Sequence, residues 1–306
     1  MSVAAVSTSV ADQVTAFAAR FRVARPFPHL VIDEFLEGAF CRQLQRECPK
    51  FDRGQARNEL GEIGRKAAYS NLPGLGKAYA EFDRLLQSPE FLSLMARLTG
   101  IPSLLHDPDY EGGGVHLNLN GQSLDQHVDF NIHPRTGAHR RLNLLLYLND
   151  EWCEEWGGCL ELQSNPRGPK ERNEVVRIVP RANRCVIFKT TERSWHGFSR
   201  VAMPEKQAHL GRRSVAIYFY TKDRPASETA PSHGTIYVPP PLPERFAVGR
   251  TLTADDVEEL EILVRRRDTQ IEYLYHRELE FSRILRSPTH RVAAMLTAPL
   301  RWLRGK

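Results

Sequence analysis

Residues 211–220 read Gly-Arg-Arg-Ser-Val-Ala-Ile-Tyr-Phe-Tyr, a polar start followed by an aliphatic and aromatic run of strand length. Side chains along a strand point alternately to its two faces, so Arg212 and Ser214 share one face with Ala216 and Tyr218. An arginine and a serine on one face can bind a carboxylate, the arginine through two parallel charge-assisted hydrogen bonds. We therefore expect a strand here that presents an anion-binding pair.

Similar short apolar runs precede this stretch, and Gly, Pro and Asn separate them. They are residues 115–119, 142–148, 159–162, 175–179 and 184–188. Six or more short strands in about 105 residues favour an antiparallel sandwich or jelly roll over alternating strands and helices. We predict a mainly β fold with helical additions, built on a double-stranded β-helix (jelly-roll) core.

Helical patterns flank the predicted strands. Residues 10–100 read as mostly helical, with one candidate helix over residues 78–98 and a charged, glycine-rich loop over residues 51–76. We expect four parts: an N-terminal helical region packing on the core (1–105), the double-stranded β-helix catalytic core (106–222), a proline-rich connection (223–252), and a long C-terminal helix with a basic tail (253–306).

The C-terminal part has two features of its own. Thr253-x-x-Asp256 resembles a helix N-cap, and apolar residues from Val257 to Leu285 support a helix of about 30 residues. Its apolar stripe must pack on the N-terminal helices or on a second subunit, which makes a homodimer one expectation. Residues 281–306 carry six basic residues and no acidic one, so we expect this tail to dock on an anionic membrane surface or an acidic protein.

Composition excludes several classes of protein. The net charge of +5, from 42 basic and 37 acidic residues, is too small to argue for nucleic-acid binding. The five cysteines form no C-x-x-C pair, so zinc ribbons and disulfide frameworks are not expected. No apolar stretch approaches the roughly 20 residues that span a bilayer, and no signal-peptide pattern opens the chain. We expect a cytoplasmic protein, with peripheral attachment at the inner membrane face as an extension of the tail hypothesis.

The sharpest local motif is His127-Val128-Asp129. In an extended segment the imidazole and the carboxylate point to the same side and can share one metal ion. A second imidazole would complete a triad of two histidines and one carboxylate, which leaves adjacent coordination positions open and suits non-haem Fe(II). His196 is the candidate, His133 is a rival ligand, and a surface hydrogen-bonded pair of His127 and Asp129 is the alternative without metal.

In their order along the chain, these motifs resemble the 2-oxoglutarate and Fe(II)-dependent dioxygenases, specifically the prolyl-hydroxylase-like branch. The order is His127-Val128-Asp129, the strand that carries Tyr147, the turn Gly157-Gly158, then His196 and Arg212-Arg213-Ser214. The resemblance covers about residues 110–221, a little over a third of the chain.

The resemblance implies a role for each matched residue. His127, Asp129 and His196 would bind Fe(II), which makes them the catalytic centre. Arg212 would pair with the C5 carboxylate of 2-oxoglutarate, with Tyr147 donating its hydroxyl to the same carboxylate and Ser214 assisting. The side chains expected to line the substrate pocket are those of Asn143, Leu145, Leu160, Phe198 and Tyr218.

Two departures from the family pattern affect the co-substrate site. Leu117 stands where some relatives have a tyrosine, so Asn118 or another group must replace its contact. The 16-residue interval from His196 to Arg212 is longer than in compact relatives, which leaves a choice between Arg212 and Arg213. Strand parity with Ser214 favours Arg212.

By this resemblance the chain is an enzyme that hydroxylates an unactivated C–H of a peptidyl residue or small metabolite, with succinate and CO₂ as co-products and ascorbate as reductant. Asp129 argues for hydroxylation over halogenation, because halogenating relatives lack the carboxylate ligand. Two other classes stay open. A cupin-like metal enzyme without 2-oxoglutarate is favoured if Arg212 faces away from the metal. A non-catalytic jelly-roll module that binds a glycan is favoured if His127 and His196 lie too far apart for one ion.

Overall fold

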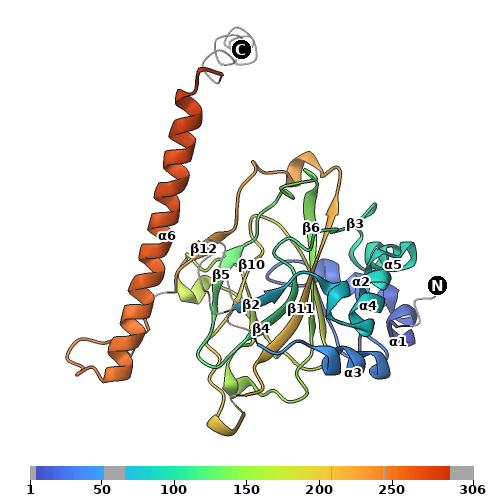
Figure 1. Ribbon diagram of the computed structural model, residues 1–306, viewed down its shortest axis with the longest axis horizontal. Coiled ribbons are helices and arrows are strands. Elements are labelled where there is room, and N and C mark those ends of the chain that lie inside the picture. Colours follow the sequence, from blue (N-terminus) through green and yellow to red (C-terminus); the bar gives the residue numbers. More distant parts are fainter. Residues whose placement is uncertain (1–4, 52–65, 208, 241, 244, 290–306) are drawn as a thin grey trace. The chain divides into compact units, whose positions relative to one another are not determined.

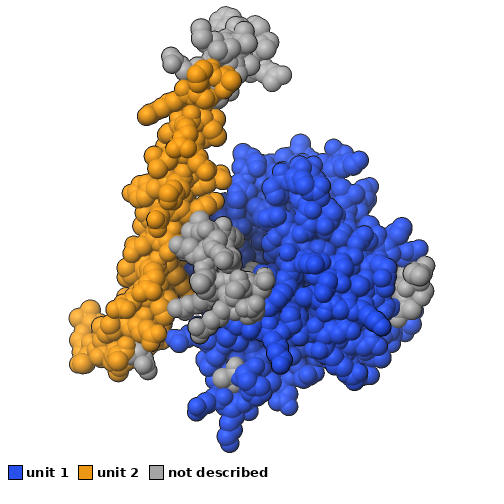
Figure 2. All heavy atoms as spheres, in the orientation of Figure 1, with its two compact units in different colours: residues 1–238 blue, residues 239–306 orange. Residues whose placement is uncertain are grey.

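The chain forms two compact units, residues 1–238 and residues 239–306, which Figure 2 colours separately. The computed structural model describes residues 5–51, 66–207, 209–240, 242–243 and 245–289. The first unit contains the sheets and the N-terminal helices, and the second contains the long helix (Figure 1).

Two antiparallel sheets build the first unit (Figure 1). The seven-stranded sheet has the order β1-β9-β6-β11-β4-β2, with β3 paired to β11, and the five-stranded sheet has the order β12-β5-β10-β7-β8. Neighbours far apart in sequence show the crossovers of a jelly roll, which confirms the mainly β class with helical additions. The strands are β1 His29–Ile32, β2 Lys66–Tyr69, β3 Leu105–His106, β4 Gly114–Asn118, β5 Leu124–Val128, β6 His139–Tyr147, β7 Leu160–Gln163, β8 Val175–Ile178, β9 Cys185–Lys189, β10 Trp195–Phe198, β11 Arg212–Thr221 and β12 Ile236–Val238.

The N-terminal helices pack on one face of the seven-stranded sheet and form the main hydrophobic core with it. This core combines helix residues such as Phe82 and Phe91 with sheet residues such as Leu144 and Ile217. The opposite face of the sheet packs on the five-stranded sheet, where Phe188 and Leu162 belong to a separate hydrophobic cluster. The helices are α1 Thr8–Asp12, α2 Val14–Val23, α3 Gly38–Glu47, α4 Lys77–Gln87 and α5 Pro89–Thr99.

The N-terminal region departs from the prediction in two places. The helix expected over residues 78–98 is two helices, because Ser88 caps α5 by accepting a hydrogen bond from the Phe91 amide and Pro89 takes the first helical position. Strands β1 and β2 come from the region read as helix and loop, and they pair with β9 and β4 at the edges of the larger sheet. A strand of four residues is too short to show a repeating pattern of apolar residues. Whether it forms therefore depends on pairing with a strand that is distant in the sequence.

The register of β11 determines which side chains face the smaller sheet. Ser214 lies opposite Tyr147 of β6, and Tyr218 lies opposite Asn143. Directly opposed residues of an antiparallel pair project from the same face. These four side chains, with Arg212 two residues before Ser214, therefore share the inner face, the one turned away from the helical core.

The second unit contains helix α6, Ala254–Arg286, whose 33 residues extend about 50 Å. Thr253 accepts a hydrogen bond from the Asp256 amide, and the Asp256 carboxylate accepts one from the Thr253 amide, which confirms the predicted N-cap as a capping box. Among the helices of the described residues, none combines the length and apolar character needed to cross a membrane.

Candidate active site

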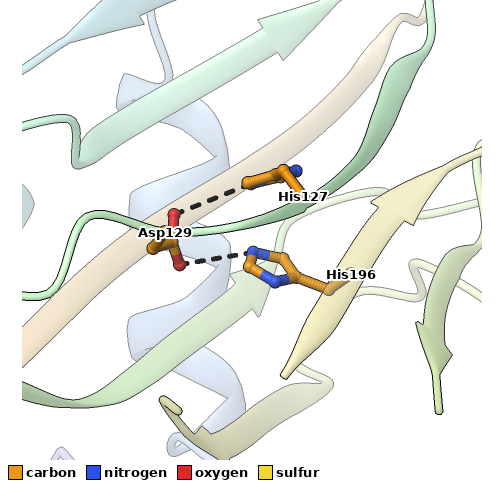
Figure 3. Close-up of side chains that lie close together, drawn as sticks. All are labelled: His127, Asp129 and His196. Atoms are coloured by element: carbon orange, nitrogen blue, oxygen red, sulfur yellow. Dashed lines mark ion pairs between the residues drawn. The ribbon is translucent and has the colours of Figure 1, made fainter. Parts of the chain in front are cut away.

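Two neighbouring strands of the smaller sheet bring the predicted metal ligands together. His127 near the end of β5 pairs directly with His196 of β10, and their ring centroids are 4.2 Å apart. Asp129 follows β5 by one residue and lies on the same side (Figure 3), with Oδ1 3.6 Å from His127 Nε2 and Oδ2 3.4 Å from His196 Nε2. The three ligand atoms lie within 4.8 Å of one another, a spacing that one ion can bridge.

The imidazoles are oriented by their other nitrogens. Nδ1 of His127 donates to the backbone carbonyl of Asp125 at 2.9 Å, and Nδ1 of His196 donates to that of Ser194 at 2.9 Å. Each Nε2 lone pair is therefore free to coordinate, as is typical of histidine ligands fixed by a carbonyl. Burial and the neighbouring His127 lower the pKa of His196 to about 3, so its ring is neutral. Two imidazoles and one carboxylate fit Fe(II).

Asp129 is held in place by two side chains of β6. The Arg140 Nη2 atom lies 2.9 Å from Asp129 Oδ2, and Asn143 Nδ2 donates to the same oxygen at 2.8 Å. Arg140 Nε also donates to Asn143 Oδ1 at 3.0 Å, which joins the two side chains. Burial would raise the pKa of Asp129, but the positive charge of Arg140 opposes it, and the pKa lies well below its usual range. The carboxylate is therefore ionised and oriented.

Arg140 is a residue of the site that sequence reasoning missed. Strict alternation would place it with Leu142 on the helix-covered face of β6. The register shifts between Phe219 and Tyr220 of β11, so that Phe219 opposes Leu142 while Tyr220 opposes Arg140. Arg141 is the extra residue of this β-bulge, and the bulge turns Arg140 inward. The only sequence signal is a pair of arginines at the start of an apolar strand.

Arg212 points into the space between the two sheets. It is 4% exposed, Nε donates to the Gly158 carbonyl at 2.7 Å, and Nη2 donates to the Tyr147 hydroxyl at 3.2 Å. Its guanidinium carbon lies 4.2 Å from the ring centroid of Phe198. Burial lowers the pKa of Arg212, and the Tyr147 hydroxyl opposes that shift. Arg212 and Tyr147 thus lie together, and Ser214 lies opposite Tyr147, the placement that the predicted carboxylate site requires.

The neighbouring Arg213 faces the other way. It is only partly buried, and its Nε donates to the Leu210 carbonyl at 3.1 Å. Its amide donates to Asn149 Oδ1 at 3.1 Å. Within the described residues, Arg212 is therefore the one of these two arginines that faces the inner space, in agreement with the parity argument.

Gly158 explains why a Gly-Gly turn precedes β7. Its φ is +65°, and an added Cβ would lie 2.9 Å from Val201 Cγ2 and 3.3 Å from Arg212 Cδ. A side chain here would strain the backbone and displace the arginine that its carbonyl holds. The turn motif in the sequence is therefore part of the Arg212 support.

The predicted lining residues divide between two parts of the inner space. Leu160 of β7 and Phe198 of β10 oppose each other beside Arg212, and Leu145 of β6 packs against the same apolar cluster as Tyr147. Tyr218 lies instead under Arg140, with 3.4 Å from the guanidinium carbon to its ring centroid, and its hydroxyl donates to the Gly112 carbonyl. Asn143, expected as lining, supports Asp129.

Strand β4 supplies the position where the family pattern is broken. Leu117 joins the helix-covered core, whereas Asn118 is buried opposite Arg212. The Asn118 side chain is therefore better placed than that of Leu117 to replace the tyrosine found in some relatives.

The rival ligand His133 belongs to a different cluster with two aspartates. Its Nε2 lies 3.1 Å from Asp107 Oδ1. Its Nδ1 accepts hydrogen bonds from the backbone amides of Arg135 and Thr136 at 3.2 Å. Nδ1 is thus the acceptor and Nε2 the donor, which leaves no ring lone pair for a metal. His133 fixes the loop that leads into β6.

The fold and these donors define a jelly-roll protein with a site for a metal bound by two histidines and one carboxylate. Residues 113–220 match the family model of the 2OG-Fe(II) oxygenase superfamily. The matched segment contains the three predicted metal ligands, Tyr147 and Arg212. The family indicated by the motif order is confirmed.

Three relatives are similar to the chain. Prolyl 3-hydroxylase OGFOD1 of Mus musculus is 23% identical over 219 residues, which cover 71% of this chain and 36% of that protein. The chain thus spans about a third of that relative's length. A prolyl hydroxylase from Trichoplax adhaerens, solved in complex with a hypoxia inducible factor oxygen degradation domain peptide fragment, is 17% identical over 70% of this chain and 91% of that one, with a TM-score of 0.48. A Pseudomonas putida prolyl-4-hydroxylase is 19% identical over 68% of this chain and 99% of that one, with a TM-score of 0.46.

Proposed function

We propose that the protein is an Fe(II)- and 2-oxoglutarate-dependent dioxygenase that hydroxylates an unactivated C–H of a peptidyl residue or small metabolite. The observation that carries this proposal is that side-chain contacts connect the metal ligand His196 with Arg212. The ring of His196 lies 4.7 Å from that of Phe188, Phe188 packs in one cluster with Tyr147, and Tyr147 accepts a hydrogen bond from Arg212. The metal ligands and Arg212 are thus linked by a continuous series of side-chain contacts between the two sheets.

Bound to His127, Asp129 and His196, Fe(II) would supply the oxidation of a C–H by O₂ that is coupled to conversion of 2-oxoglutarate to succinate and CO₂. The chain's own residues do the positioning. Carbonyl-bound Nδ1 atoms hold both imidazoles, and Arg140 keeps the Asp129 carboxylate ionised and fixed.

The co-substrate end of the site has the matching chemistry. Arg212 offers charged donors to the far carboxylate of 2-oxoglutarate, and the Tyr147 hydroxyl can turn to donate beside it. Leu160 and Phe198 exclude water from this ion pair, which strengthens it. Ser214, directly opposite Tyr147, is placed to add one more hydrogen bond.

The two alternative functions required geometries that differ from the one observed. A cupin-like enzyme without 2-oxoglutarate is favoured by an Arg212 that faces away, whereas this side chain is buried on the inner face. A binding module without metal is favoured by distant histidines, whereas the rings of His127 and His196 lie 4.2 Å apart. The dioxygenase accounts for both features.

The proposed substrate class follows from the superfamily and from the mouse relative named as a prolyl 3-hydroxylase. A test panel therefore begins with proline-containing peptides and extends to free amino acids and other small metabolites. A panel member that raises succinate formation and gains one oxygen atom identifies the class.

The decisive experiment measures succinate made by the purified chain with Fe(II), ascorbate, 2-oxoglutarate and each panel compound. Mass spectrometry under ¹⁸O₂ then follows the oxygen into the product. We expect succinate from the wild-type chain and none above background from Asp129→Ala, while His276→Ala on exposed α6 retains wild-type turnover. Binding of Fe(II) without any 2-oxoglutarate-dependent succinate would refute the proposal.

We also propose that the protein is cytoplasmic and that the basic segment 281–306, much of it outside the described residues, binds anionic membrane surfaces. Its six positive charges would each contribute about 1 kcal/mol near an anionic leaflet. Sedimentation with phosphatidylserine liposomes should show binding that falls as salt is raised. A full-length chain that stays in solution at low salt contradicts the membrane proposal.

A further inference from the structure

Helix α6 exposes an apolar stripe with a seven-residue spacing. Val257, Val264 and Ile271 are seven residues apart, and a second series interleaves with them. Six members of the stripe are between 42% and 56% exposed: Val257, Val264, Ile271, Leu274, Phe281 and Leu285. Isolated exposed apolar residues are ordinary, but a heptad series over about four heptads is the pattern of a coiled coil.

Two charged residues interrupt the stripe. In heptad letters, Val257, Val264, Ile271, Glu278 and Leu285 occupy the a positions, and Leu260, Arg267, Leu274 and Phe281 occupy the d positions. A single basic d residue and a single acidic a residue are costly in an apolar interface unless they meet each other. Their spacing therefore specifies the arrangement of the partner.

We propose that α6 forms an antiparallel coiled coil with α6 of a second copy of this chain. In antiparallel coils each a position faces a d position. One register pairs Arg267 with Glu278 of the second copy, and the twofold axis repeats that pair. The same register pairs apolar residues in the other layers within the helix: Leu260 with Leu285, Val264 with Phe281, and Ile271 with Leu274. Val257 then falls opposite Pro288, beyond the helix end.

A parallel coil of the same helix is disfavoured by charge. It would place Arg267 against Arg267 and Glu278 against Glu278 at the centre of the interface. Like charges juxtaposed in an interface cost several kcal/mol, whereas the antiparallel register turns both layers into opposite-charge pairs. A buried polar pair is also a well-attested way to fix register. The self-complementarity of the stripe identifies the second copy as its occupant.

The Arg267 guanidinium has the donors that this pairing needs. Nη2 donates to the Pro240 carbonyl at 2.8 Å and Nη1 to the Leu263 carbonyl at 3.4 Å. A guanidinium has five N–H donors, so about three remain for the carboxylate of Glu278 from the second copy. The two contacts also restrict the arginine rotamer, which lowers the entropy lost on pairing.

The test uses sedimentation equilibrium of the full-length chain, whose monomer mass is 34.9 kDa. Wild type is expected as a dimer. Arg267→Glu and Glu278→Arg each create two like-charge layers, and each should raise the dimer dissociation constant about 100-fold or more. The double variant exchanges the two charges and should restore dimerisation. Arg265→Glu makes the same charge change beside the stripe and should leave it intact.

Orientation is read from spin labels attached at Glu258→Cys and at Glu272→Cys, with the labelled wild-type chain as background. The antiparallel register offsets the two copies of residue 258 by about 40 Å along the axis and places the two copies of residue 272 at nearly one level. A parallel coil would bring both pairs equally close.

The proposal is overturned if the wild-type chain is monomeric up to about 100 µM, a range well above typical dimer dissociation constants. It is also overturned if both single charge variants dimerise like wild type, or if the double variant fails to recover. Circular dichroism of each variant verifies that α6 remains helical. None of these measurements depends on catalysis.

Discussion

The inner face of the β core and the apolar stripe of α6 both depart from the usual placement of side chains. The core buries charge: Arg140 is 1% exposed and Arg212 is 4% exposed. Helix α6 exposes apolar surface: Ile271 is 48% exposed and Leu274 is 56% exposed. Each buried cation has its partners within the same unit, whereas among the described residues no hydrophobic cluster includes the exposed stripe. The comparison separates a region completed by its own chain from a region for which we propose a second copy of the chain as partner.

The largest expected effect concerns the metal ligands of the core. His196→Ala should weaken Fe(II) binding by at least about 100-fold, because even the loss of outer partners of metal ligands costs 10- to 100-fold. Anaerobic calorimetry measures the affinity. His276→Ala on α6 is the matched control and should bind like wild type. Equal Fe(II) affinities for the two variants would contradict the assignment of the metal site to the β core.

The next effect concerns the two adjacent arginines of β11. Arg212→Ala should lower 2-oxoglutarate affinity about 100-fold, because a paired, desolvated cation is lost from the inner face. Arg213→Ala should change it less than about threefold, since that side chain is partly exposed on the opposite face. Anaerobic titration of the iron-loaded variants decides the matter. Equal losses would mean that the carboxylate lies elsewhere.

A third prediction tests whether buried charge in the core depends on its internal partner. Arg140→Met leaves the Asp129 carboxylate buried with one fewer compensating group, so the free energy of unfolding of the metal-free chain should fall by about 3 kcal/mol. Urea titration measures it. Arg135→Met breaks an exposed pair with Asp109 and should cause a much smaller change. Similar losses in both variants would argue against a special role for Arg140.

The smallest expected effect is a null result. A chain that ends at residue 252 lacks α6 but keeps all of the first compact unit. Its affinities for Fe(II) and 2-oxoglutarate should stay within about twofold of wild type, because every proposed ligand lies before residue 222. Calorimetry with both ligands checks this. A large loss of 2-oxoglutarate binding would show that the C-terminal unit belongs to the catalytic fold.

The fold class and the proposed ligands could be predicted because they depend on patterns among residues that are close together in the sequence. Short apolar runs separated by Gly, Pro and Asn indicated the strands, and period-two alternation placed Arg212, Ser214 and Tyr218 on one face. The N-cap of α6 was equally local, since Thr253 and Asp256 are only three residues apart.

Prediction failed where a distant strand decided the outcome. The short strands β1 and β2 exist because β9 and β4 offer them hydrogen-bonding edges. The helix predicted over residues 78–98 is interrupted at Ser88 and Pro89. A prediction from the spacing of apolar residues alone does not take such a capping residue and proline into account.

By itself the sequence determined the order of motifs, the parity that separates Arg212 from Arg213, and the heptad stripe of α6. Only the tertiary structure decided that Arg140 supports Asp129. Alternation counts residues along one strand, whereas a β-bulge arises from the pairing of two strands. The extra residue of β6 is visible only against the register of β11, so the inward turn of Arg140 had no signature in the sequence of β6.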